Sequence, residues 1–225
     1  MNPEVEDALT ELHGFLVGWY GPPPHSQGGP EPEDDRLPQP LASWHRMAGL
    51  WGRPLARQNH VRTVNELTRE DNKVVFYVEN QGVWLWAYEE VGEDPIVFDR
   101  ENERRTRWES TRTRLSRFVY ELTVFEAVLS ADECATAVDL THEQLDRIVE
   151  RLRPVDMVPW RWPGPEHRLW IGDGLLAFAG VNDLPGTPIL PDTLYDVFLA
   201  AQRPQNLAYL DALHIEWMRN TWKGI

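Results

Sequence analysis

The chain has 225 residues, of which 42% are hydrophobic and 26% are charged, a balance typical of a globular protein with one large domain or two small ones. Its 36 acidic residues outnumber 22 basic ones, and the net charge of −14 argues against a dedicated nucleic-acid or anionic-membrane binder. A single cysteine, Cys134, excludes an internal disulfide and a cysteine-rich zinc site. The acidic stretch after Met1 and the lack of an apolar run of about 18 residues predict a cytoplasmic protein without a signal peptide.

The N-terminal segment is predicted to form a helix that starts at Pro3, is capped by Asn2 and ends before Gly21. The apolar residues that recur at helical spacing are Val5, Ala8, Leu9, Leu12, Phe15, Leu16 and Trp19. Residues 21–36 then contain five prolines, three glycines and four acidic residues. Because such a segment buries too little to offset its ordering entropy, we predict a mobile loop within one domain that spans 1–225.

Strand-forming and helix-forming segments follow in clusters. Runs of β-branched and aromatic residues predict strands at 74–78, 83–88, 96–98, 168–172 and 175–179. Asp173-Gly174 between the last two runs is a strong hairpin signal. Apolar periodicity and capping residues predict helices at about 39–48, 115–129, 142–153, 193–202 and 205–221. This clustering indicates an α+β fold in which a single, mostly antiparallel sheet packs against helices.

The chain contains no recognisable catalytic motif: there is no P-loop, no GxSxG nucleophile elbow and no HExxH zinc motif. The seven histidines are scattered singly. We therefore predict no catalytic residue, no metal and no cofactor. One enzymatic alternative is a carbohydrate hydrolase, in which two carboxylates act as acid and base beside stacking platforms such as Trp84 and Trp86.

Charged residues occur in blocks of alternating sign. Residues 1–40 carry eight acids and one base, 41–65 four arginines and no acid, 89–103 seven acids and one base, 104–120 six arginines and one acid, and 121–146 seven acids and no base. In one interpretation, neighbouring blocks neutralise each other on the folded surface. In the other, Glu89, Glu90, Glu93 and Asp94 form an acidic face for a basic partner.

Residues 75–86, with the sequence VFYVENQGVWLW, resemble the SUKH superfamily of bacterial immunity proteins and related regulators. Other segments that agree with the family pattern are Leu37-Pro38 before a helix closing on Gly49, the strand at 94–97, and Trp108 before the helix at 115–129. The resemblance covers about residues 37–130.

This resemblance implies a single α+β domain without catalytic machinery, which binds and neutralises a protein toxin, often a nuclease. Such toxins are commonly basic because their substrates are polyanions, so an acidic surface is a suitable competitor. The expected partner-binding residues are Glu89, Glu90, Glu93, Asp94, Trp84 and Trp86. The expected partner is a protein rather than a nucleic acid or a membrane, and the chain itself is expected to be a monomer or homodimer. A regulatory or scaffold protein of the same fold, with no toxin, is the second non-enzymatic interpretation.

Overall fold

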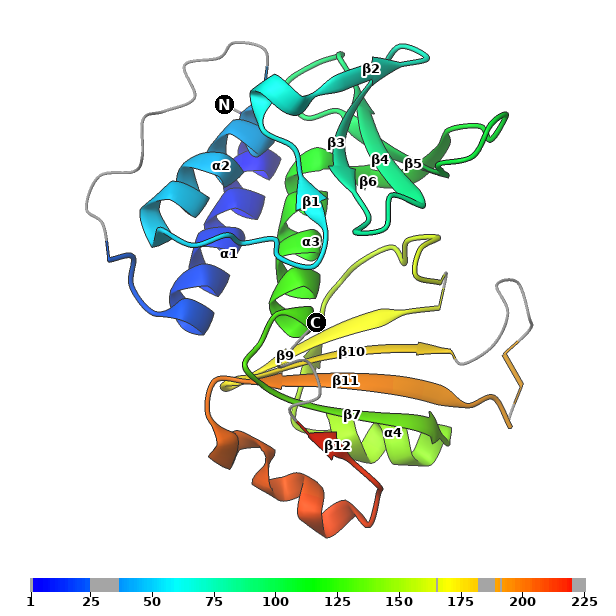
Figure 1. The fold of residues 1–225 in the computed structure, drawn as a ribbon. Coiled ribbons are helices and arrows are strands. Elements are labelled where there is room, and N and C mark those ends of the chain that lie inside the picture. The colour runs from blue at the N-terminus through cyan, green and yellow to red at the C-terminus, as the bar shows by residue number, and fades with distance from the viewer. Residues whose placement is uncertain (1, 25–36, 165, 182–188, 191, 220–225) are drawn as a thin grey trace. The chain divides into compact units, whose positions relative to one another are not determined.

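The computed structural model describes residues 2–24, 37–164, 166–181, 189–190 and 192–219. It confirms the α+β class, but the strands form two six-stranded sheets rather than the single sheet expected (Figure 1). The single-sheet prediction is wrong because the N-terminal and C-terminal groups of strands pair only within their own group. The chain accordingly divides into two compact units, Met1–Glu126 and Ala127–Ile225, where one domain over 1–225 is predicted.

The predicted N-terminal helix is confirmed as α1 (Pro3–Tyr20). The side chain of Asn2 accepts a hydrogen bond from the backbone N–H of Glu4 at 3.1 Å, which satisfies one of the N–H groups that a helix start leaves without a partner. The residues of α1 with fully buried side chains are Val5, Leu12 and Leu16. Their spacing of seven and four residues places them on one helix face.

The second helix, α2 (Gln39–Trp51), extends beyond the predicted range of 39–48. It ends where Gly52 adopts a left-handed conformation with φ 60°, the usual way for glycine to close a helix. Within the first unit α2 is anchored by Trp44, whose indole Nε1 donates to Thr123 Oγ1 at 2.9 Å.

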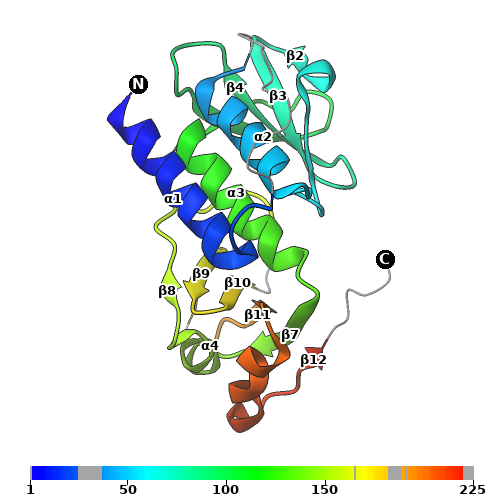
Figure 2. The ribbon, with the colours of Figure 1, turned by 90° about the vertical axis from the view of Figure 1, so that its left-hand side faces the viewer.

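Helices α1 and α2 run parallel, so that their C-terminal ends lie together (Figure 2). Trp51 Nε1 donates to the carbonyl of Gly21 at 3.0 Å, and the guanidinium of Arg53 lies 4.2 Å from the ring centre of Tyr20. The end of α1 and the start of α2 are therefore separated by about the length of α2, about 20 Å for its 13 residues. Most of the loop predicted at 21–36 lies outside the described residues.

The first sheet has the strand order β1-β3-β4-β5-β6, and β2 also pairs with β3. Its elements are β1 (His60–Val61), the short 3-10 helix η1 (Val64–Glu66), β2 (Thr68–Glu70), β3 (Lys73–Val78), β4 (Trp84–Glu89), β5 (Ile96–Glu101) and β6 (Glu109–Arg114). The strands predicted at 74–78, 83–88 and 96–98 are confirmed as β3, β4 and β5. Strand β6 was not predicted because Glu109–Arg114 has no apolar residue.

Helix α3 (Leu115–Leu129), predicted over the same range, packs against the aromatic side chains of this sheet. The ring centre of Phe118 lies 5.8 Å from that of Phe76 and 6.3 Å from those of Tyr77 and Trp86. All four side chains are fully buried, so aromatic packing forms the core of the first unit.

The second sheet has the strand order β12-β7-β11-β10-β9-β8. The elements of this unit are β7 (Glu133–Leu140), α4 (His142–Val149), β8 (Arg153–Pro154), β9 (Arg168–Gly172), β10 (Leu175–Val181), β11 (Tyr195–Ala201), the 3-10 helix η2 (Pro204–Leu213) and β12 (Met218–Arg219). The hairpin predicted at 168–172 and 175–179 is confirmed as β9 and β10.

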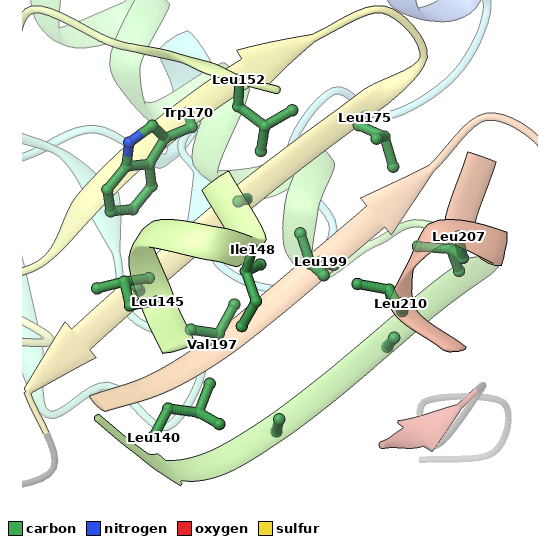
Figure 3. Packing of buried hydrophobic residues seen from close by; sticks show 14 of the residues in the cluster. Leu140, Leu145, Ile148, Leu152, Trp170, Leu175, Val197, Leu199, Leu207 and Leu210 are labelled. Carbon is green, nitrogen blue, oxygen red and sulfur yellow. The ribbon is translucent and has the colours of Figure 1, made fainter. Parts of the chain in front are cut away.

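One face of the second sheet carries the hydrophobic core of this unit (Figure 3). Figure 3 shows Ile148 of α4 beside Val197 of β11, and Leu145 of α4 and Leu199 of β11 belong to the same cluster. Helix α4 starts with the predicted capping box: Thr141 accepts from Gln144 N–H at 3.3 Å, and the Gln144 side chain accepts from Thr141 N–H at 2.9 Å. It ends at Val149, four residues before the predicted end.

The helix predicted at 193–202 is wrong, because this segment is strand β11 (Tyr195–Ala201). It pairs with β10 on one side and β7 on the other. Every second residue contributes to the core: Tyr195, Val197, Leu199 and Ala201. This is the two-residue period of a strand rather than the period of a helix. The helix predicted at 205–221 is found only in part, as the 3-10 helix η2 followed by β12.

Candidate functional site

A pocket of about 560 Å³ lies at one end of the first sheet, where the turn between β2 and β3 meets the end of β4. The residues that line it are Arg69, Glu70, Asp71, Asn72, Glu89, Glu90 and Val91. Four of these seven residues are acidic and one is basic. Val91 is 71% exposed, so the pocket presents an apolar side chain next to its charges.

The turn between β2 and β3 consists of Asp71 and Asn72, which connect the paired residues Glu70 and Lys73. Both turn residues have left-handed backbones, with φ 49° for Asp71 and 62° for Asn72. A two-residue hairpin turn of this kind requires positive φ at both positions, and aspartate and asparagine tolerate it best after glycine. The turn chemistry therefore fixes the Asp71 carboxylate at the pocket.

On one face of the sheet, the register aligns Glu70, Lys73 and Glu89 across three strands. Lys73 Nζ lies 2.7 Å from Glu89 Oε1, and Arg100 forms an ion pair with Glu70. The side chains of Lys73 and Arg100 are only 11% and 12% exposed. The carboxylates of Glu89 and Glu70 are thus partly neutralised by two largely buried cations.

On the other face, Arg69 and Glu90 form a two-point ion pair. Arg69 Nη2 donates to Glu90 Oε1 at 2.7 Å, and Arg69 Nε donates to Glu90 Oε2 at 3.1 Å. These hydrogen bonds hold the pKa of Glu90 below its ordinary value, so the carboxylate is ionised at neutral pH. Both side chains remain accessible, with Arg69 62% and Glu90 49% exposed.

The predicted acidic face is only partly formed. Glu89 and Glu90 line the pocket, and Glu93 is exposed but is not among the lining residues. Asp94 is buried, with 7% exposure, so it is not on the surface where the predicted acidic face would place it. Its carboxylate accepts hydrogen bonds from Ser116 N–H at 2.8 Å and Ser116 Oγ at 2.7 Å. It thereby satisfies a backbone N–H in the first turn of α3, which has no partner within the helix.

The two predicted aromatic residues do not line the pocket with Glu89 and Glu90. Trp86 is fully buried, with its ring centre 4.7 Å from that of Tyr77, and so it is a core residue rather than the surface residue predicted. Trp84 is partly buried and does not line the pocket. The physical reason is alternation along β4, which turns Trp86 toward the aromatic core while Glu89 lies on the opposite face.

Sequence reasoning missed the half of the pocket contributed by β2 and its turn. Thr68–Glu70 carries no apolar residue, so it gives no strand signal. The dipeptide Asp71-Asn72 before an apolar run was the available clue, since these residue types favour two-residue hairpin turns. Pairing with β3 then brings Arg69 to Glu90, which is 21 residues further along the chain.

A second carboxylate of note, Glu126, is fully buried in the first unit. Its Oε2 accepts from the backbone N–H groups of Arg57 and Gln58, both at 2.8 Å. Its Oε1 accepts from Asn59 N–H at 3.1 Å and from the Tyr77 hydroxyl at 2.7 Å. Burial raises the pKa of Glu126, while these hydrogen bonds oppose the rise. The group is closed to solvent and anchors the segment after α2, so it does not support the hydrolase interpretation.

The described part of the chain contains neither a metal-binding cluster nor a membrane-spanning helix. No group of three or more histidine, cysteine, aspartate or glutamate side chains in it is arranged to hold a metal ion. None of its helices combines the length and apolar character needed to cross a bilayer.

Comparisons with protein-family models, with curated proteins and with solved structures find no match for this chain. The resemblance to the SUKH superfamily therefore stays a prediction.

Proposed function

We propose that the chain is a non-catalytic binding protein of the bacterial cytoplasm, which neutralises a protein toxin through the pocket at the end of the first sheet. The observation that carries this proposal is the lining, with four acidic residues against one arginine beside the 71% exposed Val91. A basic partner finds complementary charge and an apolar contact in the same place. The net charge of −14 favours attraction of such a partner at long range. The SUKH resemblance supports the same role.

The pocket is the expected centre of a larger contact. A stable interface buries about 800 Å² on each partner, and most of its binding energy comes from a few central residues. Glu90 and Val91 are candidates for that centre because both line the pocket and are accessible. Glu93 belongs to the surrounding rim, where charge mainly affects the rate of association and its salt dependence.

A charge-reversal experiment tests the surface. The double variant Glu90→Lys/Glu93→Lys is compared with Glu143→Lys/Glu150→Lys, which makes the same charge change at exposed residues of the second unit. The candidate partners are the products of the genes that flank this one, and calorimetry with each is carried out at low and high salt. We expect the first variant to bind about tenfold more weakly and with a flatter salt dependence. Equal loss in both variants, or no loss in either, contradicts the proposed surface.

A functional assay separates neutralisation from the regulatory or scaffold interpretation. The toxic activity of the partner is measured alone and in an equimolar complex with this protein. Neutralisation predicts that the activity is lost in the complex and returns with Glu90→Lys/Glu93→Lys. A scaffold predicts that the complex forms and the activity persists.

A further inference from the structure

The Arg69–Glu90 ion pair differs from the other two ion pairs of the pocket in its exposure. Lys73 and Arg100 are 11% and 12% exposed, whereas Arg69 is 62% exposed. An ion pair between two accessible side chains is weak, because water competes for both charges. Arg69 is therefore the cation at the pocket that an incoming group can most readily replace.

A buried hydroxyl lies close to this pair. Tyr88 is 1% exposed, and its hydroxyl has no hydrogen-bond partner among the residues that the structure describes. Arg69 and Tyr88 both pair with Val74, from opposite sides, so all three side chains lie on the same face of the sheet. Burial and, second to it, the nearby Glu90 carboxylate raise the pKa of Tyr88 to about 12, so the hydroxyl is protonated and neutral. An unsatisfied buried hydroxyl is costly and calls for a polar partner.

A third polar group of the pocket is also available. The Asp71 carboxylate makes no ion pair within the described ranges of the chain. Two of these groups, the Glu90 and Asp71 carboxylates, line the pocket and can accept hydrogen bonds from a ligand, whereas the buried Tyr88 hydroxyl lies near Glu90 without lining the pocket. A guanidinium has five N–H donors in one plane and matches several acceptors at once, whereas an ammonium group acts as a compact point charge.

We propose that the pocket accepts an arginine side chain of the partner, whose guanidinium replaces that of Arg69 on Glu90 and also donates to Asp71. Arg69 occupies the position of this ligand in the free protein, and its two-point contact with Glu90 shows the geometry that the incoming group adopts. The exposed Val91 contacts the aliphatic part of the inserted side chain. The identity of the ligand as part of a protein partner rests on the proposed function, but the recognition can be tested without that partner.

The test uses short acetylated and amidated glycine peptides that carry one central arginine, lysine or citrulline. Binding to the full chain is followed by the backbone amide NMR shifts of Asp71, Asn72 and Val91. We expect the arginine peptide to shift these signals at the lowest concentration, the lysine peptide at a higher one, and the neutral citrulline peptide not at all. Arg69→Ala removes the internal competitor and should tighten arginine-peptide binding about fivefold.

Three further variants complete this experiment. Glu90→Gln should weaken binding of the arginine peptide about tenfold, and Asp71→Asn should weaken it about threefold. The matched control is Arg219→Ala, which removes another exposed arginine that is paired with an acid, here Asp211. It changes the net charge as Arg69→Ala does and should leave binding unchanged.

The proposal is overturned if Arg69→Ala fails to tighten binding, if it strengthens arginine and lysine peptides equally, or if the citrulline peptide binds as well as the arginine peptide. Its failure is distinguishable from failure of the proposed function. If the peptides do not bind but Glu90→Lys/Glu93→Lys releases the toxin, arginine recognition alone is wrong. If the peptides behave as expected and no toxin is neutralised, the pocket is retained and the immunity role is wrong.

Discussion

His167 of the second unit is an imidazole enclosed by aromatic rings. Its ring centre lies 5.5 Å from that of Trp160 and 5.7 Å from that of Phe178, and the residue is 1% exposed. Its Nδ1 donates to the carbonyl of Gly164. Burial lowers the pKa of His167 to about 4, against the opposing effect of this hydrogen bond. The side chain is therefore neutral in the folded protein at physiological pH.

This lowered pKa makes stability depend on pH in a defined direction. In the unfolded chain the imidazole titrates near 6.5, so the unfolded state takes up a proton that the folded state resists down to about pH 4. The free energy of unfolding contributed by His167 therefore falls as the pH drops from 6.5 to about 4 and is constant below that. The total loss is about 3 kcal/mol, at about 1.4 kcal/mol per pKa unit.

Replacement of the imidazole tests this dependence. Between about pH 7 and about pH 4.5, the free energy of unfolding should fall by about 2 to 3 kcal/mol less in His167→Phe than in the wild type. Urea denaturation at the two pH values measures this difference. The contribution of the carboxylates cancels in this comparison. His142→Phe, at a site where the histidine side chain is 66% exposed, should keep the wild-type dependence. An unchanged pH dependence in His167→Phe would show that the imidazole is not responsible.

Residue roles divide clearly into those that sequence could predict and those that it could not. Glu89 and Glu90 were predicted because charge clustering is visible along the chain. The burial of His167 was not, because its sequence neighbours, Glu166 and Arg168, are charged and its aromatic contacts are seven and eleven residues away. The role of Asp94 was also hidden, since its partner Ser116 is 22 residues further along the chain.

At the level of elements, Asp94 connects the acidic loop between β4 and β5, residues 90–95, to the start of α3. Its carboxylate accepts from both the N–H and the hydroxyl of Ser116. We expect Asp94→Ala to lower the free energy of unfolding by about 1 to 2 kcal/mol, because a buried helix-start N–H loses its partner. Thermal unfolding followed by circular dichroism measures this loss.

The adjacent residue provides the control for this prediction. Glu93 is exposed, and Glu93→Ala should leave the unfolding temperature nearly unchanged, as surface substitutions usually do. If both variants unfold at the same temperature, the capping role assigned to Asp94 is wrong. If Asp94→Ala is folded and also loses the partner, the acidic loop acts on binding through the position of its backbone.

Sequence signals predicted an element correctly where a capping motif and an apolar face occurred together. Helix α4 has a capping box at Thr141 and Gln144 and a clear apolar face, and its start was correct. Strand β11 was mistaken for a helix because its apolar residues are consecutive as well as alternating, with Phe198 and Ala200 on its second face. Pairing on both sides, with β10 and β7, decides the structure there, and this tertiary information is absent from the segment itself.

At the level of the whole molecule, the charge blocks neutralise each other only in part. Arg117, from the basic block at 104–120, pairs with Glu11, from the acidic block at 1–40, at 2.7 Å. Glu89 and Glu90, from the acidic block at 89–103, pair with Lys73 and Arg69, which lie outside the basic blocks. Neutralisation between blocks therefore accounts for some of the charge, and the pocket retains an acidic excess.

The parallel arrangement of α1 and α2 sets a minimum length for the chain between them. Residues 21–38 must span about 20 Å, for which about six extended residues suffice. We expect deletion of residues 26–31 to change the free energy of unfolding by less than about 1 kcal/mol, because closure entropy varies slowly with loop length. Deletion of residues 22–36 leaves three residues, which reach only about 10 Å, and should prevent both helices from packing. Urea denaturation distinguishes the two outcomes, and equal stability of both variants contradicts the parallel arrangement.

Because of the same arrangement, we expect the protein to tolerate a backbone cut or an insertion between α1 and α2. Helix α1 is held by the burial of Val5, Leu12 and Leu16 and by the Trp51–Gly21 hydrogen bond, so its attachment does not depend on an intact backbone between the helices. A single cut there should leave two fragments that migrate together under native conditions and separate only in denaturant. A fluorescent tag or an additional recognition module inserted at this point would leave the pocket and the strand pairing of both units in place.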